Sequence, residues 1–161
     1  MRKALFAALV LSVPVLASAA DRLAEPIKLE LKDFKILGLD GKENAEVFGY
    51  NADDNKLFYY TRGIATATAK FPEDGEYTLV LEASCDKAKD ELAKLKIKVG
   101  DKVVKEDFAL TTDGIKEYKF DVTVKKGEAK LSVEFLNDTY KEGEYDLNFY
   151  LHAAKFEKKA K

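Results

Sequence analysis

The chain has few of the residues on which most catalytic and metal centres depend. Its 161 residues include one Cys, one His, one Met, three Pro and no Trp. One Cys forms no internal disulfide, and one Cys with one His cannot supply the ligands of a zinc site. A Gly-rich phosphate loop and a nucleophile elbow are also missing. The sequence therefore argues against a zinc site, a nucleotide-binding site and a serine-hydrolase active site.

The single Cys and the single His have plain structural interpretations. Cys85 closes an apolar segment, and we predict a small buried side chain there. His152 lies inside an alternating segment, which favours a packed or surface residue over the base of a Ser-His-Asp triad. Paired carboxylates could cleave a glycosidic bond, but a domain of this length offers little cleft. We expect a protein that is not an enzyme.

Long apolar runs are absent except at the amino terminus. Residues 1–20 combine a basic start, an apolar run with one Pro and a group of small residues, which is typical of a secretory signal peptide. The run is too short for a spanning helix. We predict cleavage near Ala20, a secreted or periplasmic protein, and one domain over residues 21–161.

Charge is balanced rather than concentrated. Cleavage would leave 27 − 2 = 25 basic residues against 29 acidic ones, a formal charge of −4. Lysines and acids interleave along the chain, and such a surface does not suit polyanions. Nucleic acid is therefore not an expected partner.

The chain does contain a series of segments that alternate between apolar and polar residues. The clearest are "PIKLELKDFKIL", "GIATATAKF", "EYTLVLEAS", "LKIKV", "KVVKEDFAL", "KEYKFDVTV", "AKLSVEF" and "LNFYLHAAKF". Turns rich in Gly and Asp separate them, which predicts an all-β sandwich or barrel. Residues 86–96 contain good helix formers, but their alternation with residues 97–99 favours a strand at the end. Residues 38–56 are the longest loop-like segment.

A cluster of four carboxylates lies in "FLNDTYKEGEYDLNFYL", residues 135–151. The acids are Asp138, Glu142, Glu144 and Asp146. Calcium prefers such oxygen ligands, but the spacing is not that of an EF-hand, which would need Glu at the position of Phe149. The alternating flanks predict a strand, an acidic loop and a strand. A solvated hairpin without metal is the plain alternative.

The same stretch resembles the carboxyl-terminal signature of calcium-dependent, xylan-binding-type carbohydrate-binding modules. The first half of the signature is matched by Asn137, Asp138 and Tyr140, and the second half by Asp146, Asn148 and Tyr150. Upstream, "LFYYTRGIATATAKFPEDGEYTLVLEAS" is similar to an early strand pair of that family. The resemblance implies a single antiparallel β-sandwich of the jelly-roll, galactose-binding-like type.

The resemblance also implies a calcium ion whose coordination is completed by sugar hydroxyl groups. The metal ligands it implies are the carboxylates of Asp138 and Asp146 and backbone carbonyls from Tyr140 and from Glu144 or Tyr145. The ligand-binding residues it implies are Asn137, Tyr140, Tyr145 and Asn148. The expected partner is a xylan-like or galactan-like polysaccharide. Tyr59 and Tyr60 are further aromatic candidates, without a motif to support them.

Three departures from the family pattern define an alternative. Leu147 replaces the usual Arg, His152 replaces the usual Asp, and Trp is absent from the chain. The alternative is a structural or protein-interaction β-sandwich with a protein partner, in which calcium only stabilises the loop.

Overall fold

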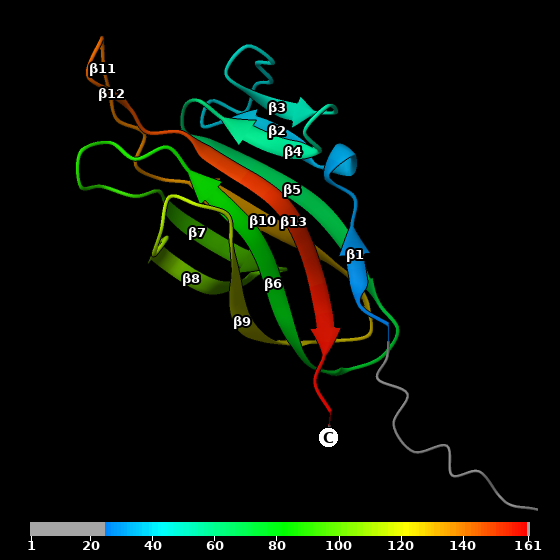
Figure 1. Cartoon of the computed structure of the whole chain (residues 1–161). Helices are drawn as coiled ribbons and strands as arrows, with labels where there is room; N and C mark the ends of the chain where they lie inside the picture. The colour runs from blue at the N-terminus through cyan, green and yellow to red at the C-terminus, as the bar shows by residue number, and fades with distance from the viewer. Residues whose placement is uncertain (1–24, 161) are drawn as a thin grey trace, which may run out of the picture.

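The computed structural model describes residues 25–160 and consists of two antiparallel β-sheets packed face to face (Figure 1). The signal peptide predicted over residues 1–20 lies outside this range and stays a prediction. Within residues 25–160, no helix is both long enough and apolar enough to cross a membrane.

The first sheet, sheet A, has the strand order β3–β4–β13–β6–β9, and β1 pairs with β13 beside this path. Its strands are β1 Ile27–Leu29, β3 Phe48–Asn51, β4 Lys56–Tyr59, β6 Gly75–Cys85, β9 Lys116–Val124 and β13 Phe149–Lys158. The second sheet, sheet B, has the order β2–β5–β10–β7–β8. Its strands are β2 Lys35–Gly38, β5 Gly63–Phe71, β7 Lys94–Val99, β8 Lys102–Ala109 and β10 Gly127–Phe135.

Alternation with a period of two places one face of each strand in the core. Along β10, Leu131, Val133 and Phe135 are fully buried, whereas the residues between them are half-buried. The rings of Tyr59 and Phe149 lie 5.1 Å apart, and Phe135 packs beside both. Burying one such side chain stabilises the fold by about 1.5–3 kcal/mol. The predicted antiparallel β-sandwich is confirmed.

Two segments differ in detail from the sequence-based predictions. The alternation over residues 27–31 does not continue as one strand, because β1 ends at Leu29 and a 3-10 turn, η1 Leu31–Asp33, intervenes before β2. Residues 38–56 are not one loop, because they contain β3. In both segments the element boundaries depend on how the chain packs against the rest of the sandwich. Local alternation between apolar and polar residues does not determine such packing.

Residues 86–96 form no helix. A single bridge joins Ala88 to Glu91, and β7 starts at Lys94. Ala93, Leu95 and Ile97 are all buried on one side of this extended chain, and that burial outweighs the helix propensity of the segment. The strand predicted at its end is confirmed.

One end of the sandwich brings together the ends of several strands. Phe149 at the start of β13 pairs with Tyr59 at the end of β4 and with Cys85 at the end of β6. The chain between β10 and β13 projects beyond both sheets as a hairpin of β11 Tyr140–Lys141 and β12 Tyr145–Asp146 (Figure 1). The acidic segment of the sequence thus lies at this end.

Candidate functional site

The acidic segment is a loop between the strands β10 and β13, as predicted, and a short two-stranded hairpin forms inside it. Tyr140 pairs with Asp146 and Lys141 with Tyr145. Gly143 turns the chain with a φ of 70°, a conformation that Gly adopts without steric cost. The backbone N–H of Leu147 donates to the carbonyl of Thr139 at 2.9 Å, so the pairing continues inward from the hairpin. Asp138 and Asn148 are the next residues along the two sides of this segment, outside the paired strands.

Two buried oxygen atoms of this segment have no hydrogen-bond partner within residues 25–160. They are Oδ1 of Asp138 and Oδ1 of Asn148. The other carboxylate oxygen of Asp138 accepts a hydrogen bond from the Thr61 hydroxyl at 3.0 Å. A buried polar atom without a partner costs about 1–3 kcal/mol, so a pair of them suggests that a ligand completes the site.

Asp86 is a site residue that the sequence did not indicate. Its Oδ2 accepts hydrogen bonds from the Asn148 amide at 2.9 Å and from the Tyr150 hydroxyl at 2.7 Å. Its backbone N–H donates to the Asn148 carbonyl at 3.0 Å. Asp86 directly follows β6, and only the pairing of β6 with β13 brings it beside the acidic segment. No local motif in the sequence reveals this.

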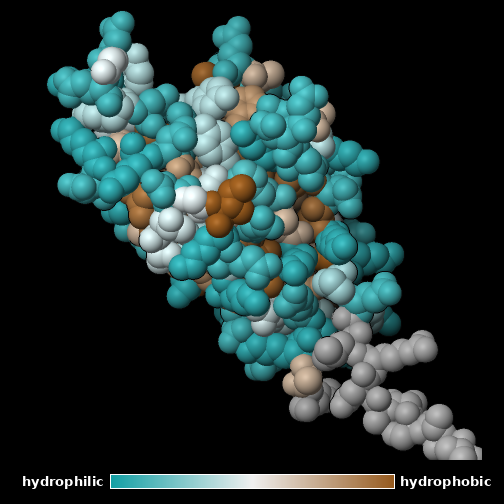
Figure 2. Space-filling view, viewed as in Figure 1, coloured by the Kyte–Doolittle hydropathy of each residue, from teal (hydrophilic) through white to brown (hydrophobic). Residues whose placement is uncertain are grey.

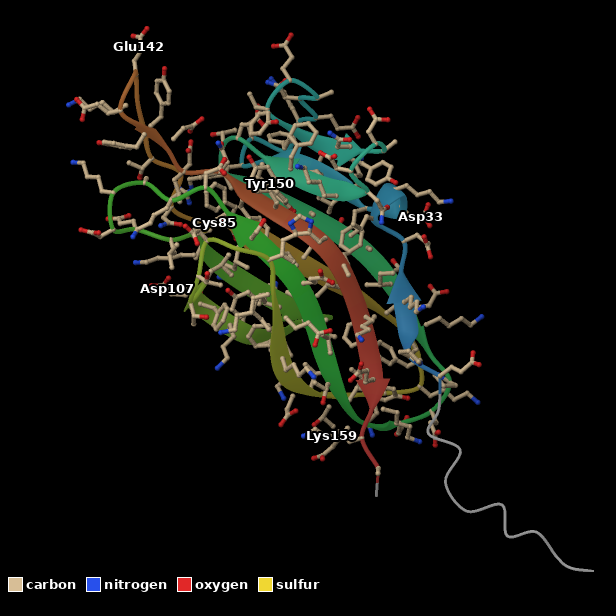
Figure 3. All side chains as sticks on the ribbon, viewed as in Figure 1. Asp33, Cys85, Asp107, Glu142, Tyr150 and Lys159 are labelled. Atoms are coloured by element: carbon tan, nitrogen blue, oxygen red, sulfur yellow. The ribbon has the colours of Figure 1, made fainter. Side chains whose placement is uncertain are left out.

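The pKa of Tyr150 is raised mainly because the side chain is partly buried. It is raised above the ordinary value of 10.0, first by burial and then by the hydrogen bond to Asp86, with the charges of Asp86 and Asp146 and the proximity of Tyr60 adding to it. Tyr150, labelled in Figure 3, extends from the start of β13. Only the smaller contributions from Asp86 and Asp146 reflect negative charge near Tyr150, and that charge favours a cation.

The remaining predicted metal ligands lie in the hairpin itself. Tyr140 is 66% exposed, and Asp146, opposite it, is also exposed. Glu144 forms an ion pair with Lys141 at the turn. The ring of Tyr145 lies under the Lys89 ammonium, 5.0 Å from the ring centroid. Nothing in these contacts tests whether the hairpin residues bind a metal, and their assignment stays a prediction.

Two other candidates have structural roles. The Asn137 side chain accepts a hydrogen bond from the backbone N–H of Lys94 at 2.7 Å and donates to the carbonyl of Leu92 at 3.0 Å, so it ties the segment to the start of β7. Tyr59 is fully buried in the core, so the suggestion that it contacts a ligand is wrong. Tyr60 is 46% exposed and lies against Phe58, with ring centroids 4.9 Å apart.

The donor atoms fit a hard cation, although the acids are spread out. No three Asp, Glu, His or Cys side chains within residues 25–160 form a group that could hold a metal ion. Calcium, however, also takes amide, carbonyl and water oxygens. The unpartnered oxygens of Asp138 and Asn148, with Asp86 beside Asn148, are such a donor set. Glu142, by contrast, lies at the far tip of the hairpin (Figure 3).

Nothing in the described residues forms a nucleophilic centre. Ser84 Oγ and His152 Nε2 lie 2.8 Å apart, but no acidic side chain in the described range hydrogen-bonds the imidazole. Cys85 is buried, and burial raises the pKa of its thiol. The plain interpretations of Cys85 and His152 are therefore confirmed.

Comparison with known protein families gives one match. Residues 78–160, just over half of the chain, match the family CBM60, described as a calcium-dependent, xylan-binding carbohydrate-binding module. The matched range includes Asp86, Asp138 and Asn148. Comparison with curated protein sequences gives no match.

Several solved structures share the fold at low sequence identity. A family 35 carbohydrate-binding module from Clostridium thermocellum is 15% identical with a TM-score of 0.57, over 83% of this chain and 98% of that one. A CBM36 module in complex with calcium and xylotriose is 14% identical with a TM-score of 0.57, over 80% and 98%. A GH26–CBM35 β-(1,4)-mannanase from Podospora anserina is 12% identical with a TM-score of 0.55, over 84% of this chain and 28% of the enzyme.

The family match and the fold agree with the resemblance in the acidic segment. The chain belongs to the CBM60 family of calcium-dependent, xylan-binding carbohydrate-binding modules.

Proposed function

We propose that the protein is a non-catalytic module that binds a xylan-like or galactan-like polysaccharide through a calcium ion at the end of sheet A. The observation that carries the proposal is the pair of buried oxygens of Asp138 and Asn148, which have no partner within residues 25–160. An oxygen-only site with open positions suits a cation that also accepts the vicinal hydroxyl groups of a sugar.

The residues of the site divide into those that would hold calcium and those that orient them. Asp138 Oδ1 and Asn148 Oδ1 would be ligands, and carbonyls of the hairpin would add to them. Thr61 fixes the Asp138 carboxylate through its other oxygen. Asp86 fixes the Asn148 amide so that its oxygen, not its nitrogen, is left unpaired. Asp146 adds negative charge near Tyr150.

Calcium, when bound, supplies coordination positions for a diol, and the neighbouring aromatic residues would contact the ring of the sugar. Tyr60 directly precedes Thr61 and is partly exposed, with Phe58 supporting its ring. Such a face can cover the apolar side of a pyranose. Tyr140 is the most exposed aromatic residue of the described chain and is the second candidate. Tyr145 is already covered by Lys89.

Two comparisons support this assignment. The family is described as calcium-dependent and xylan-binding, and one structure with the same fold was solved with calcium and xylotriose. We further propose that the protein is exported after cleavage near Ala20, because residues 1–20 have the composition of a signal peptide.

Isothermal titration with xylan and galactan oligosaccharides, in calcium and in EDTA, tests the proposal. We expect dissociation constants between millimolar and micromolar, about −4 to −8 kcal/mol, in calcium only. Binding that is equal in EDTA, or absent with every saccharide, would refute it.

One observation favours the second candidate, a structural or protein-interaction sandwich. The described acids do not gather into a group of three, and Asp86 is already engaged by two donors. In that case calcium would raise the melting temperature without any glycan binding, and a protein partner would co-purify.

A further inference from the structure

A depression on the outer face of sheet A lies apart from the acidic segment. It has a volume of about 270 Å³ and is bounded by β1, by the β3–β4 turn and by strands β6, β9 and β13. None of Asp86, Asp138, Asn148 and Tyr150 lines it. Figure 2 views the molecule from the side of sheet A and shows a mostly hydrophilic surface with isolated apolar areas.

The floor of this depression is small and apolar. Val80 is only 2% exposed, yet it is not part of the core cluster, because it points to the outer face of β6. Ala153 lies on the neighbouring β13, paired with Glu82. Val80 is covered, so the half-buried Ala153 is the apolar surface that stays accessible, and the rim is built from longer residues.

The rim is polar but almost neutral. Glu82 pairs directly with Glu117 across β6 and β9, and Lys155 lies 3.8 Å from Glu117. The charged residues that line the depression are the acids Glu30, Glu82 and Glu117 and the lysines Lys28 and Lys155. The formal charge of the lining is therefore −1. Two carboxylates directly opposite each other destabilise a sheet unless something separates or pairs them. A lining with this balance suits a polar, uncharged ligand better than an ion.

Two rim residues are held in position by contacts that do not involve a ligand. A β-bulge between Leu151 and Ala153 re-aims His152, whose Nε2 lies 2.8 Å from Ser84 Oγ. Asn55 adopts a φ of 46°, and its Oδ1 accepts a hydrogen bond from the Tyr50 hydroxyl at 3.0 Å. Its amide N–H groups are left for another acceptor. Such pre-positioned polar groups reduce the entropy that a ligand must lose on binding.

We propose that this depression is a second saccharide-binding site, which takes one sugar unit without calcium. The half-buried Ala153, with the covered Val80 beneath it, offers a small apolar floor to the carbon–hydrogen side of a sugar ring. A rim of carboxylate, amide and ammonium groups pairs with the hydroxyl groups of the sugar. The size suits a single ring rather than a long oligosaccharide. The inference extends the proposed glycan binding to another surface, and it does not require the site at Asp138.

Nitrogen-15 NMR titration of the full chain with xylotriose and with β-1,4-galactotriose, in EDTA, tests the inference. We expect amide shifts at residues 80–82, 117 and 152–155, saturating at millimolar saccharide. The double variant Glu82→Gln/Glu117→Gln should weaken this binding about tenfold, because it removes two hydrogen-bond acceptors of full charge. Ala153→Phe should abolish it by filling the floor.

Glu76→Gln is the matched control, since it removes one charge from the same strand β6 outside the depression. It should bind as the wild type does, and urea unfolding checks that each variant is folded. Shifts that persist in Asp138→Asn support the inference even if no calcium-dependent binding exists. Absence of shifts at these amides with both trisaccharides, or shifts that survive in both the double variant and Ala153→Phe, would overturn it.

Discussion

Replacing Asp138 with Asn gives the sharpest test of the proposed calcium site. Asn has nearly the shape of Asp, so the hydrogen bond from the Thr61 hydroxyl can persist. The change removes the negative charge of the one carboxylate that has an oxygen buried without a partner within residues 25–160. We therefore expect calcium binding to fall sharply while the fold stays intact.

The size of the stability change distinguishes the loss of calcium binding from the effect of the substitution on the fold itself. Without calcium, a charge-assisted hydrogen bond becomes a neutral one, a loss of about 1 kcal/mol in the free energy of unfolding. At calcium concentrations of about 100 times the dissociation constant, binding stabilises the wild type by about 2.7 kcal/mol. For a domain of this size, that corresponds to a rise in melting temperature of about 10 °C. The variant should show little of this rise.

Thermal unfolding by circular dichroism, in EDTA and across a calcium titration, measures both quantities. Glu142→Gln is the matched control, because it removes one charge from the exposed tip of the same hairpin and should keep the full response. A wild type whose melting temperature does not respond to calcium refutes the site. A variant Asp138→Asn that responds like the wild type refutes the assignment of the ligand.

Four further predictions concern neighbouring residues. Thr61→Val frees the second oxygen of the Asp138 carboxylate and should lower calcium affinity about 2–10-fold in a calorimetric titration. Tyr60→Ala should weaken oligosaccharide binding by about 1 kcal/mol or more while calcium affinity is unchanged; equal affinity for sugar would exclude Tyr60 from the site. Phe149→Ala leaves a cavity in the core and should cost about 3–5 kcal/mol in urea unfolding. Burial lowers the pKa of His152 in the folded protein, so the contribution of this side chain to stability is complete above pH 6.5 and is lost as the pH falls through the lower pKa of the folded protein. His152→Gln should therefore make the free energy of unfolding less dependent on pH. Urea titrations between pH 7.5 and 5 measure this dependence.

For the acidic segment, the local sequence predicted the secondary structure but not the role of each residue. The alternating flanks were enough to predict two strands with an acidic loop between them, and the pattern around Asn137 and Asn148 was enough to predict the family. The same pattern did not distinguish the roles of its members. Asn137 ties the segment to β7, whereas Asn148 leaves a buried oxygen unpaired. That difference depends on which strands lie beside each residue.

The sequence did not predict that Asp86 and Thr61 lie at the site. They lie 62 and 77 residues from their respective partners Asn148 and Asp138. Neither stands in a motif; Asp86 directly follows β6, and Thr61 lies two residues after the end of β4. Their proximity to the site follows from the register of β13 with β4 and β6, and long-range register is set by which faces the whole sandwich buries.

The sequence by itself determined the all-β class, the positions of most strands, the acidic loop and the family, because these depend on alternation and on residues close together in the chain. The tertiary structure alone decided which oxygens are buried without partners, that Asp86 and Thr61 join them, that Tyr59 is core while Tyr60 is exposed, and that sheet A carries a second depression. These features arise where strands distant in sequence pack together, and burial and register between such strands are properties of the complete fold.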